Sequence, residues 1–163
     1  MRARPGPGPG PGPGQAGSGS EASDLGLVAE KCHLPVDYLE QIVDLLHDKR
    51  QIVFYGPPGT GKTFVAQELA AFLAGGSSER AILVQFHPST SYEDFFEGIR
   101  PRTDDEGRLH YELRPGPLAR VAEKARSNPD ETYVVVIDEF NRANLPKVLG
   151  ELLFLLEYRD REI

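Results

Sequence analysis

Features of secreted and membrane proteins are absent from this sequence. It has one cysteine, Cys32, and no tryptophan. A single cysteine excludes an intramolecular disulfide, and Cys32 has no cysteine or histidine partner at the spacing of a structural zinc site. No stretch approaches the roughly 18 apolar residues of a membrane span, and proline and glycine stand where an export signal has its apolar region. The sequence therefore predicts a cytoplasmic protein that has no membrane partner.

The sequence also has fewer basic residues than acidic residues. Lysine and arginine number 18 against 25 aspartates and glutamates, which gives a formal net charge of -7. A chain this acidic is a poor candidate for tight, nonspecific binding to a phosphate backbone. DNA contact is therefore not evident in this segment, and any nucleic-acid partner must be met locally or elsewhere.

The first residues have the composition of a segment that does not fold. Residues 5–14 alternate proline and glycine without a break, and residues 15–23 are mostly small or polar. Such a segment buries too little apolar surface to offset the entropy lost on folding, so residues 1–24 are predicted to be a disordered leader. Residues 25–163 are expected to belong to a globular domain, in which regular structure begins near Leu34.

Beyond the leader, apolar residues recur with the periods of alternating helices and strands. The charged segment from Arg100 to Arg114 is expected to be irregular. Alternating strands and helices favour an α/β fold with a parallel sheet and right-handed crossovers. Strands are predicted at Gln51–Tyr55, Ala81–Phe86 and Tyr133–Ile137, and helices at Leu34–His47, Thr63–Ala74, Ser91–Glu97 and Pro117–Ser127 and from Leu145 to Leu156.

A phosphate-binding loop is the strongest chemical signal in the chain. It fits the pattern G-x-x-x-x-G-K-[ST] between a predicted strand and a predicted helix. The backbone N–H groups of the loop and the helix N-terminus are expected to bind phosphates. Lys62 is predicted to reach the β- and γ-phosphates, and so to act in catalysis as well as in binding, while Thr63 offers its hydroxyl to Mg²⁺. The residues of the loop are Gly56, Pro57, Pro58, Gly59, Thr60, Gly61, Lys62 and Thr63.

A second motif is an apolar strand that ends in two carboxylates, Asp138 and Glu139. Ligands bind at the carboxyl ends of parallel strands in α/β folds, so Asp138 is predicted to face the Mg²⁺ site. Glu139 is predicted to orient and deprotonate the attacking water, because phosphoryl transfer requires mainly positioning and charge neutralisation. The two motifs together predict Mg²⁺-dependent hydrolysis of the β–γ phosphoanhydride bond of ATP or GTP.

The two motifs, followed by Asn-Arg-Ala-Asn at residues 141–144 and a leucine-rich helix, resemble the AAA+ P-loop ATPases, in the group that includes dynein-related and MoxR-like proteins. Residues 86–95, 97–101 and 113–118 are more specifically similar to the McrB-type NTPases of methylation-dependent restriction systems. The resemblance extends from Leu34 to the C-terminus. It implies a three-layer α/β sandwich that forms a homo-oligomeric ring when full length and uses nucleotide hydrolysis to remodel a partner. A McrB-like protein would also have a nuclease-type partner subunit.

The AAA+ ATPases continue past the Asp-Glu strand to a fourth strand with a polar sensor, a fifth strand, a trans-acting arginine and a helical lid. The resemblance therefore implies that the chain is the N-terminal portion of such a domain, truncated at its C-terminus. In the family's strand order, 5-1-4-3-2, the fourth strand lies between the strands predicted at Gln51–Tyr55 and Tyr133–Ile137. Both strands are expected to lack a neighbour there, which leaves hydrogen bonds of the sheet unmade.

The residues leave other functions open. One alternative is a GTP-specific, McrB-like restriction subunit, and another is a fragment that binds Mg²⁺ and nucleotide without efficient hydrolysis. Superfamily-one helicases also use a G-P-P-G-T-G-K-T loop, although small residues generally follow their Asp-Glu pair, where this chain has Phe140, Asn141 and Arg142. Solvation is the favoured interpretation for a set of basic side chains, and contact with a neighbouring subunit or a nucleic acid is the alternative. The set consists of Arg142, Lys147, Arg159 and Arg161.

Overall fold

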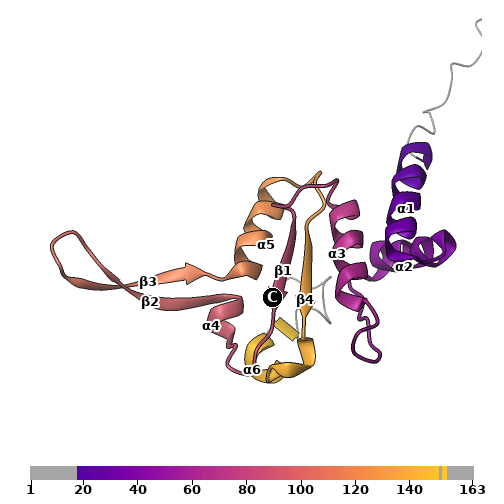
Figure 1. Ribbon diagram of the computed structural model, residues 1–163. Coiled ribbons are helices and arrows are strands. Elements are labelled where there is room, and N and C mark those ends of the chain that lie inside the picture. Colours follow the sequence, from indigo (N-terminus) through magenta and orange to yellow (C-terminus); the bar gives the residue numbers. More distant parts are fainter. Residues whose placement is uncertain (1–17, 151, 154–163) are drawn as a thin grey trace, which may run out of the picture. The chain divides into compact units, whose positions relative to one another are not determined.

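The computed structural model describes residues 18–150, 152 and 153, and describes their side chains from residue 25 onward. The chain divides into two units, residues 1–52 and residues 53–163. Figure 1 labels the helices and strands of both units. Within the described residues, no helix is both long enough and apolar enough to span a lipid bilayer.

The first unit contains two helices that contact each other, α1 (Ser18–Cys32) and α2 (Val36–Lys49). Helix α2 is confirmed, with Pro35 at its N-cap. The expected start of regular structure near Leu34 is wrong, because α1 begins at Ser18. Residues 18–24 of the predicted leader are therefore helical, and residues 1–17 lie outside the described residues. Apolar residues at helical spacing give α1 a face to bury. The buried side chains of this unit are Leu25, Val28, Ala29, Leu39 and Ile42.

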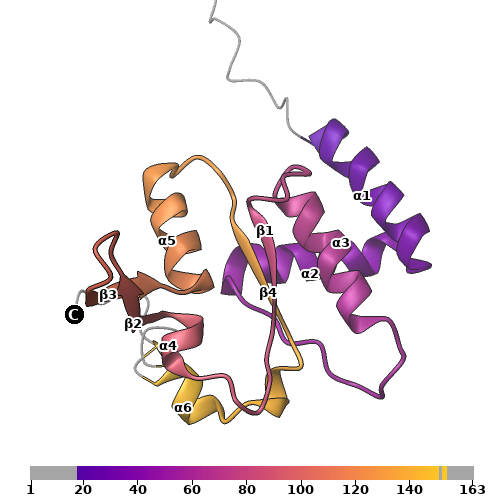
Figure 2. The same ribbon diagram turned by 60° about the vertical axis from the view of Figure 1, so that its left-hand side comes forward.

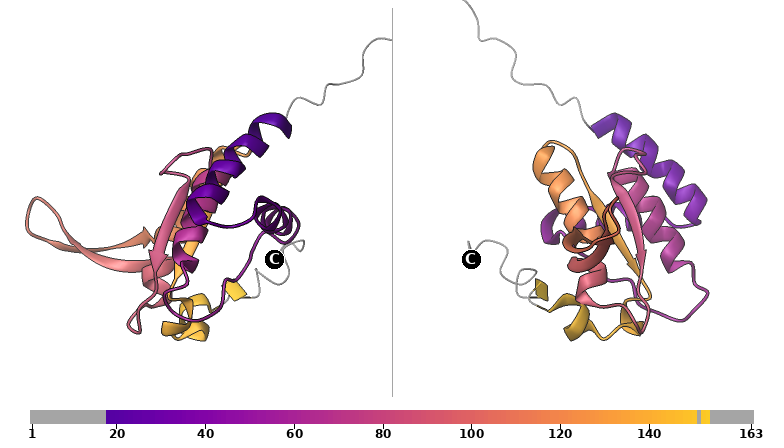
Figure 3. Two further views of the ribbon diagram at one scale, coloured as in Figure 1. Left: turned by 45° about the vertical axis from the view of Figure 1, so that its right-hand side comes forward. Right: turned by 90° about the vertical axis from the view of Figure 1, so that its left-hand side faces the viewer.

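The second unit is built on a parallel pair of strands, β1 (Ala81–Gln85) and β4 (Val134–Asp138). Their register runs from Ala81 opposite Val134 to Gln85 opposite Asp138, so the carboxyl ends of both strands lie side by side. Helices α3 (Lys62–Leu73) and α5 (Pro117–Ser127) lie on opposite sides of the pair, as Figures 2 and 3 show. The predicted α/β fold with a parallel sheet is therefore confirmed.

The main core of the second unit lies beyond the carboxyl ends of the two strands. Two aromatic rings meet there edge to face, with the centroids of Phe86 and Phe95 5.0 Å apart. Helix α6 (Leu145–Leu149) adds Val148 and Leu149 to this cluster. Asn144 caps the helix by accepting a hydrogen bond from the Lys147 N–H. The end predicted for that helix, Leu156, lies outside the described residues.

The strand predicted at Gln51–Tyr55 is not formed. A strand is stable only when its N–H and C=O groups pair with a neighbour. Strand β4 pairs with β1 on one edge, and no strand of the described residues pairs with its other edge. Val53 and Tyr55 are accordingly 69% and 93% exposed. The apolar and aromatic composition of this segment indicates a strand, but a strand also requires a neighbouring strand to pair with, and composition does not reveal whether one is present.

The segment predicted to be irregular is an antiparallel hairpin of β2 (Glu97–Thr103) and β3 (Leu109–Pro115). The short helix α4 (Tyr92–Phe95) precedes it, within the range predicted for a helix, and begins with a capping box between Ser91 and Asp94. One face of the hairpin is charged, and the other carries exposed apolar residues in cross-strand pairs. That apolar face comprises Ile99 opposite Leu113, Pro101 opposite Tyr111, and Thr103 opposite Leu109.

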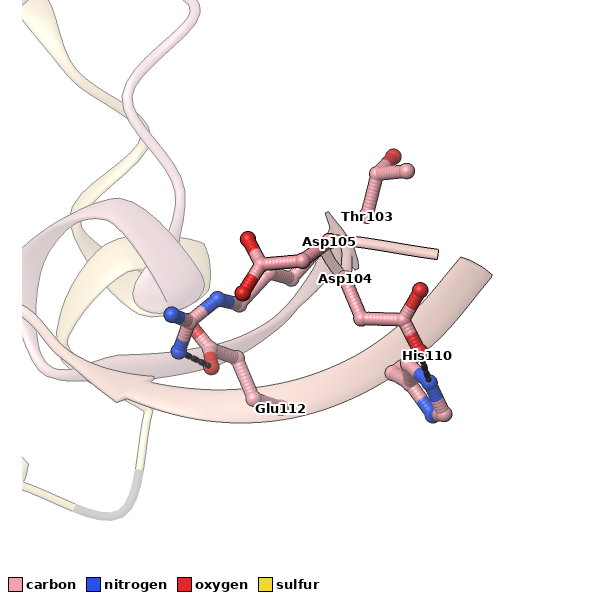
Figure 4. A pocket seen from close by; sticks show the side chains of 6 residues that line it. Thr103, Asp104, Asp105, His110 and Glu112 are labelled. Carbon is pink, nitrogen blue, oxygen red and sulfur yellow. Dashed lines mark hydrogen bonds and ion pairs between the residues drawn. The ribbon is translucent and has the colours of Figure 1, made fainter. Parts of the chain in front are cut away.

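The tip of the hairpin is organised around Asp104, next to a small hollow shown in Figure 4. Asp104 Oδ1 accepts hydrogen bonds from the backbone N–H groups of Glu106 (3.0 Å) and Arg108 (2.8 Å). Its Oδ2 lies 2.7 Å from His110 Nε2. These bonds hold the pKa of Asp104 below its usual value, chiefly through the Arg108 backbone N–H and next through the His110 side chain.

We expect acid to loosen the hairpin tip. Because the pKa of Asp104 is lower in the folded chain, its contribution to stability is present above the unfolded value of about 3.9 and is lost as the pH falls through the folded value. Hydrogen exchange at the amides of Glu106 and Arg108, corrected for intrinsic rates, should therefore accelerate in that range. The Asp104→Asn variant should show fast exchange already at pH 7, whereas the control Asp105→Asn should not. Equal protection in both variants would contradict the prediction.

Candidate functional site

The phosphate-binding loop connects the segment before Gly56 to the first turn of α3, which begins at Lys62. Gly59 and Gly61 have φ angles of +77° and +78°, in the left-handed region that favours glycine. A Cβ atom on either glycine would have no protein atom within 4 Å. The glycines are therefore required by the backbone conformation of the loop and not by close packing against it.

The ammonium group of Lys62 lies within the curve of the loop. Its Nζ donates hydrogen bonds to the carbonyl oxygens of Gly56 (3.0 Å) and Pro57 (2.5 Å), and it lies 3.3 Å from Thr60 Oγ1. Thr60 Oγ1 in turn donates to the Pro57 oxygen at 3.0 Å. The loop therefore concentrates positive charge at its centre, next to the N-terminus of α3.

A single hydrogen bond joins the two sequence motifs. Thr63 Oγ1, in the first turn of α3, donates to Asp138 Oδ1 at the end of β4 over 3.0 Å. Both side chains are partly buried. Two residues that are 75 positions apart in the sequence thus place a hydroxyl and a carboxylate side by side at the carboxyl ends of the strands.

Glu139 follows β4 in a left-handed conformation, with φ 53° and ψ 37°. Its backbone N–H donates to Asp138 Oδ1 at 3.0 Å, so that this oxygen accepts from both Thr63 and Glu139. The chain then turns into the short 3₁₀ helix η1 (Phe140–Arg142). A non-glycine residue with positive φ is uncommon and draws attention to Glu139 as a functional candidate.

Glu139 has a partner that was not predicted from the sequence. Its Oε2 forms an ion pair with Arg142 Nε at 2.9 Å, so Arg142 is not simply a solvated basic residue. The signal was present in the sequence as opposite charges three residues apart, a spacing that brings side chains together on one turn of helix. The described part of the chain therefore brings together Thr63, Asp138, Glu139 and Arg142, while Lys62 binds the carbonyl groups of its own loop.

An α/β unit with a glycine-rich loop before a helix, and with carboxylates at the end of a parallel strand, belongs to the P-loop nucleotide-binding class. Within that class, the sequence model of one protein family, the AAA domain (dynein-related subfamily), matches residues 51–163. The chain therefore belongs to the AAA family, as its motifs predicted. This assignment removes the superfamily-one helicase alternative.

Two relatives belong to restriction systems. The chain is 41% identical over 129 residues to the Type IV methyl-directed restriction enzyme EcoKMcrB subunit of Escherichia coli K12, an alignment that covers 78% of this chain and 27% of that protein. It is 26% identical over 129 residues to the Type II restriction enzyme BsuMI component YdiS of Bacillus subtilis 168, covering 66% of this chain and 38% of that protein. The predicted similarity to McrB-type proteins is confirmed. The chain spans well under half the length of either relative.

Proposed function

We propose that this chain binds Mg²⁺ and ATP and hydrolyses the β–γ phosphoanhydride bond. The observation that carries the proposal is the 3.0 Å hydrogen bond between Thr63 Oγ1 and Asp138 Oδ1. It joins the end of the phosphate-binding loop to the end of β4, so residues for phosphate binding and residues for metal binding lie together at the carboxyl ends of the strands. Membership of the AAA family supports the same function.

In this proposal the backbone N–H groups of residues 56–63 bind the phosphates, and Lys62 exchanges its bonds to the loop carbonyl groups for bonds to the β- and γ-phosphates. Glu139 accepts a proton from the water that attacks the γ-phosphorus. The bond between the γ-phosphorus and the bridging oxygen then breaks, which releases ADP and phosphate. Lys62 and Glu139 are the proposed catalytic residues.

The donor atoms at the strand end fit Mg²⁺. This ion prefers oxygen ligands, typically one or two from protein side chains with the rest from water and phosphate. Thr63 Oγ1 and Asp138 Oδ1 are adjacent oxygens of this kind, and we propose that these two residues hold the ion. When bound, Mg²⁺ neutralises charge on the phosphate oxygens.

The Asp138→Asn substitution tests the metal part of the proposal. Asparagine keeps an oxygen that accepts from Thr63 and from the Glu139 N–H, but it removes the negative charge. We expect the affinity for ATP with Mg²⁺ to fall about tenfold, and the affinity without Mg²⁺ to stay within about twofold, because only the metal-dependent contact is lost. Titration with a fluorescent ATP analogue, with and without Mg²⁺, measures both.

The matched control is Asp130→Asn, at an exposed aspartate in the loop before β4. It should bind like the unmodified chain under both conditions. If Asp138→Asn retained the full effect of Mg²⁺ on affinity, Asp138 would not be a metal ligand. If the unmodified chain bound neither ATP nor GTP, the proposed function itself would be contradicted.

A second candidate is a restriction-system subunit that uses GTP. The observation in its favour is the 41% identity to a methyl-directed restriction enzyme subunit. Competition of unlabelled ATP and GTP against the same fluorescent analogue separates the two candidates.

We further propose that the full-length protein forms a homo-oligomeric ring that remodels a partner, with a nuclease-type subunit as that partner in the restriction-system case. Sedimentation of the full-length protein with and without nucleotide tests the ring.

A further inference from the structure

Arg142 is joined to Glu139 at two places. Its Nε lies 2.9 Å from Glu139 Oε2, and its backbone N–H donates to the Glu139 carbonyl oxygen at 2.8 Å. Both contacts close the single turn of η1. Within the described residues, the Glu139 carboxylate has no other hydrogen bond or ion pair. Arg142 therefore sets the direction of the Glu139 side chain.

The main chain of Glu139 is fixed from the opposite side. Its N–H donates to Asp138 Oδ1, the oxygen that also accepts from Thr63. The left-handed conformation at φ 53° is unfavourable for a glutamate, so it requires these surrounding bonds. The Glu139 backbone is thus held by the proposed metal-binding pair, and its carboxylate is held by Arg142.

We propose that Arg142 is a positioning residue for Glu139, an inference that rests on the proposed function. It holds one carboxylate oxygen and leaves the other to accept the proton of the attacking water. It also neutralises the charge of Glu139, which would otherwise repel the triphosphate bound at the neighbouring loop. The planar, permanently charged guanidinium suits both tasks.

A second ion pair of the chain, between Arg126 and Glu123, serves as a comparison for the pair of Arg142 and Glu139. Arg126 and Glu123 have the same spacing on α5, but their charged atoms are 3.4 Å apart and their side chains are 80% and 70% exposed. Arg142 and Glu139 are 59% and 35% exposed. Exposed pairs of this spacing contribute little to stability, so Arg126 provides a matched control.

The test is a double-mutant cycle on nucleotide affinity, which requires no turnover. Arg142→Ala should raise the Kd for Mg²⁺–ATP about threefold, because the bare carboxylate then faces the triphosphate. In the Glu139→Gln background, where residue 139 carries no charge, the same substitution should change Kd by less than about 1.5-fold. Arg126→Ala should have no effect in either background.

Turnover of Mg²⁺–ATP gives the second readout. Arg142→Ala should lower kcat on the order of tenfold, because the carboxylate loses its direction, whereas KM should follow only the change in Kd. Arg142→Lys keeps the positive charge and should recover part of kcat. Combining Arg142→Ala with Glu139→Gln should add nothing to the loss caused by Glu139→Gln alone.

The possible outcomes separate the two proposals. Coupling between Arg142 and Glu139 in Kd or in kcat supports the positioning role. An equal loss in both backgrounds would indicate a purely structural residue, and no loss in either would indicate a solvated ion pair; both results overturn the inference and leave the proposed function intact. Absence of nucleotide binding in the unmodified chain would overturn the proposed function and the role of Arg142 together.

Discussion

Replacing Lys62 with alanine should reduce nucleotide affinity on the order of 100-fold or more. The substitution removes the only charged donor of the phosphate-binding loop, which is proposed to contact two phosphates. A hydrogen bond to a charged group contributes about 1.5–3 kcal/mol, and each 1.4 kcal/mol corresponds to a factor of about ten in affinity. Two such bonds therefore account for the expected loss. Equilibrium titration with a fluorescent ATP analogue measures it.

Two controls make the Lys62→Ala result interpretable. Lys124→Ala removes a lysine of α5 that pairs with Glu79 at 3.1 Å, and it should leave affinity unchanged. Thermal unfolding of Lys62→Ala should stay close to that of the unmodified chain, because the hydrogen bonds that Lys62 Nζ makes in the described structure go to carbonyl and hydroxyl groups of its own loop. A folded Lys62→Ala variant with unchanged affinity would remove Lys62 from the phosphate site.

Local sequence patterns were sufficient where an element makes most of its own bonds. Helix α5 occupies Pro117–Ser127, the range that its apolar spacing predicts, and α3 ends at Leu73, just before the Gly75–Gly76 pair and close to the predicted Ala74. The phosphate-binding loop is also local, because its glycines and Lys62 are adjacent in the sequence. These features require no knowledge of the rest of the fold.

Elements that depend on distant partners were predicted less well. Gln51–Tyr55 has the composition of a strand but no neighbouring strand in the described residues, so it stays unpaired. The β2–β3 hairpin was missed because Pro101 and many charged residues weaken its strand signal. Its alternation of apolar residues, from Leu109 through Tyr111 to Leu113, is visible in the sequence. In this segment the period of the apolar residues indicates the strands, and the charged residues between them obscure it.

The candidate site shows the same division. Carboxylates at the end of an apolar strand are evident from the sequence, and the structure places Asp138 beside Thr63. The left-handed backbone of Glu139 is not evident, because it depends on how the chain turns after β4, whereas the three-residue spacing of Glu139 and Arg142 does indicate their ion pair. The sequence thus indicates which groups carry the chemistry, and the structure adds how one of them is oriented.

Replacing Glu139 with glutamine should leave nucleotide binding intact and slow hydrolysis about 100- to 10,000-fold, the usual contribution of a general base. Glutamine has the same shape, and its backbone N–H can still donate to Asp138 Oδ1. The amide, however, cannot accept a proton from water. The expected result is a Kd within about twofold of the unmodified value, together with a large fall in kcat.

Fluorescence titration measures Kd, and phosphate release in the presence of Mg²⁺ measures kcat. Glu123→Gln is the matched control, because it removes a carboxylate that pairs with Arg126 at the same spacing on an exposed helix. It should leave both Kd and kcat unchanged. Undiminished hydrolysis by Glu139→Gln would exclude Glu139 as the base. A parallel loss of binding would instead mean that this carboxylate holds the nucleotide site together and does not act on the water.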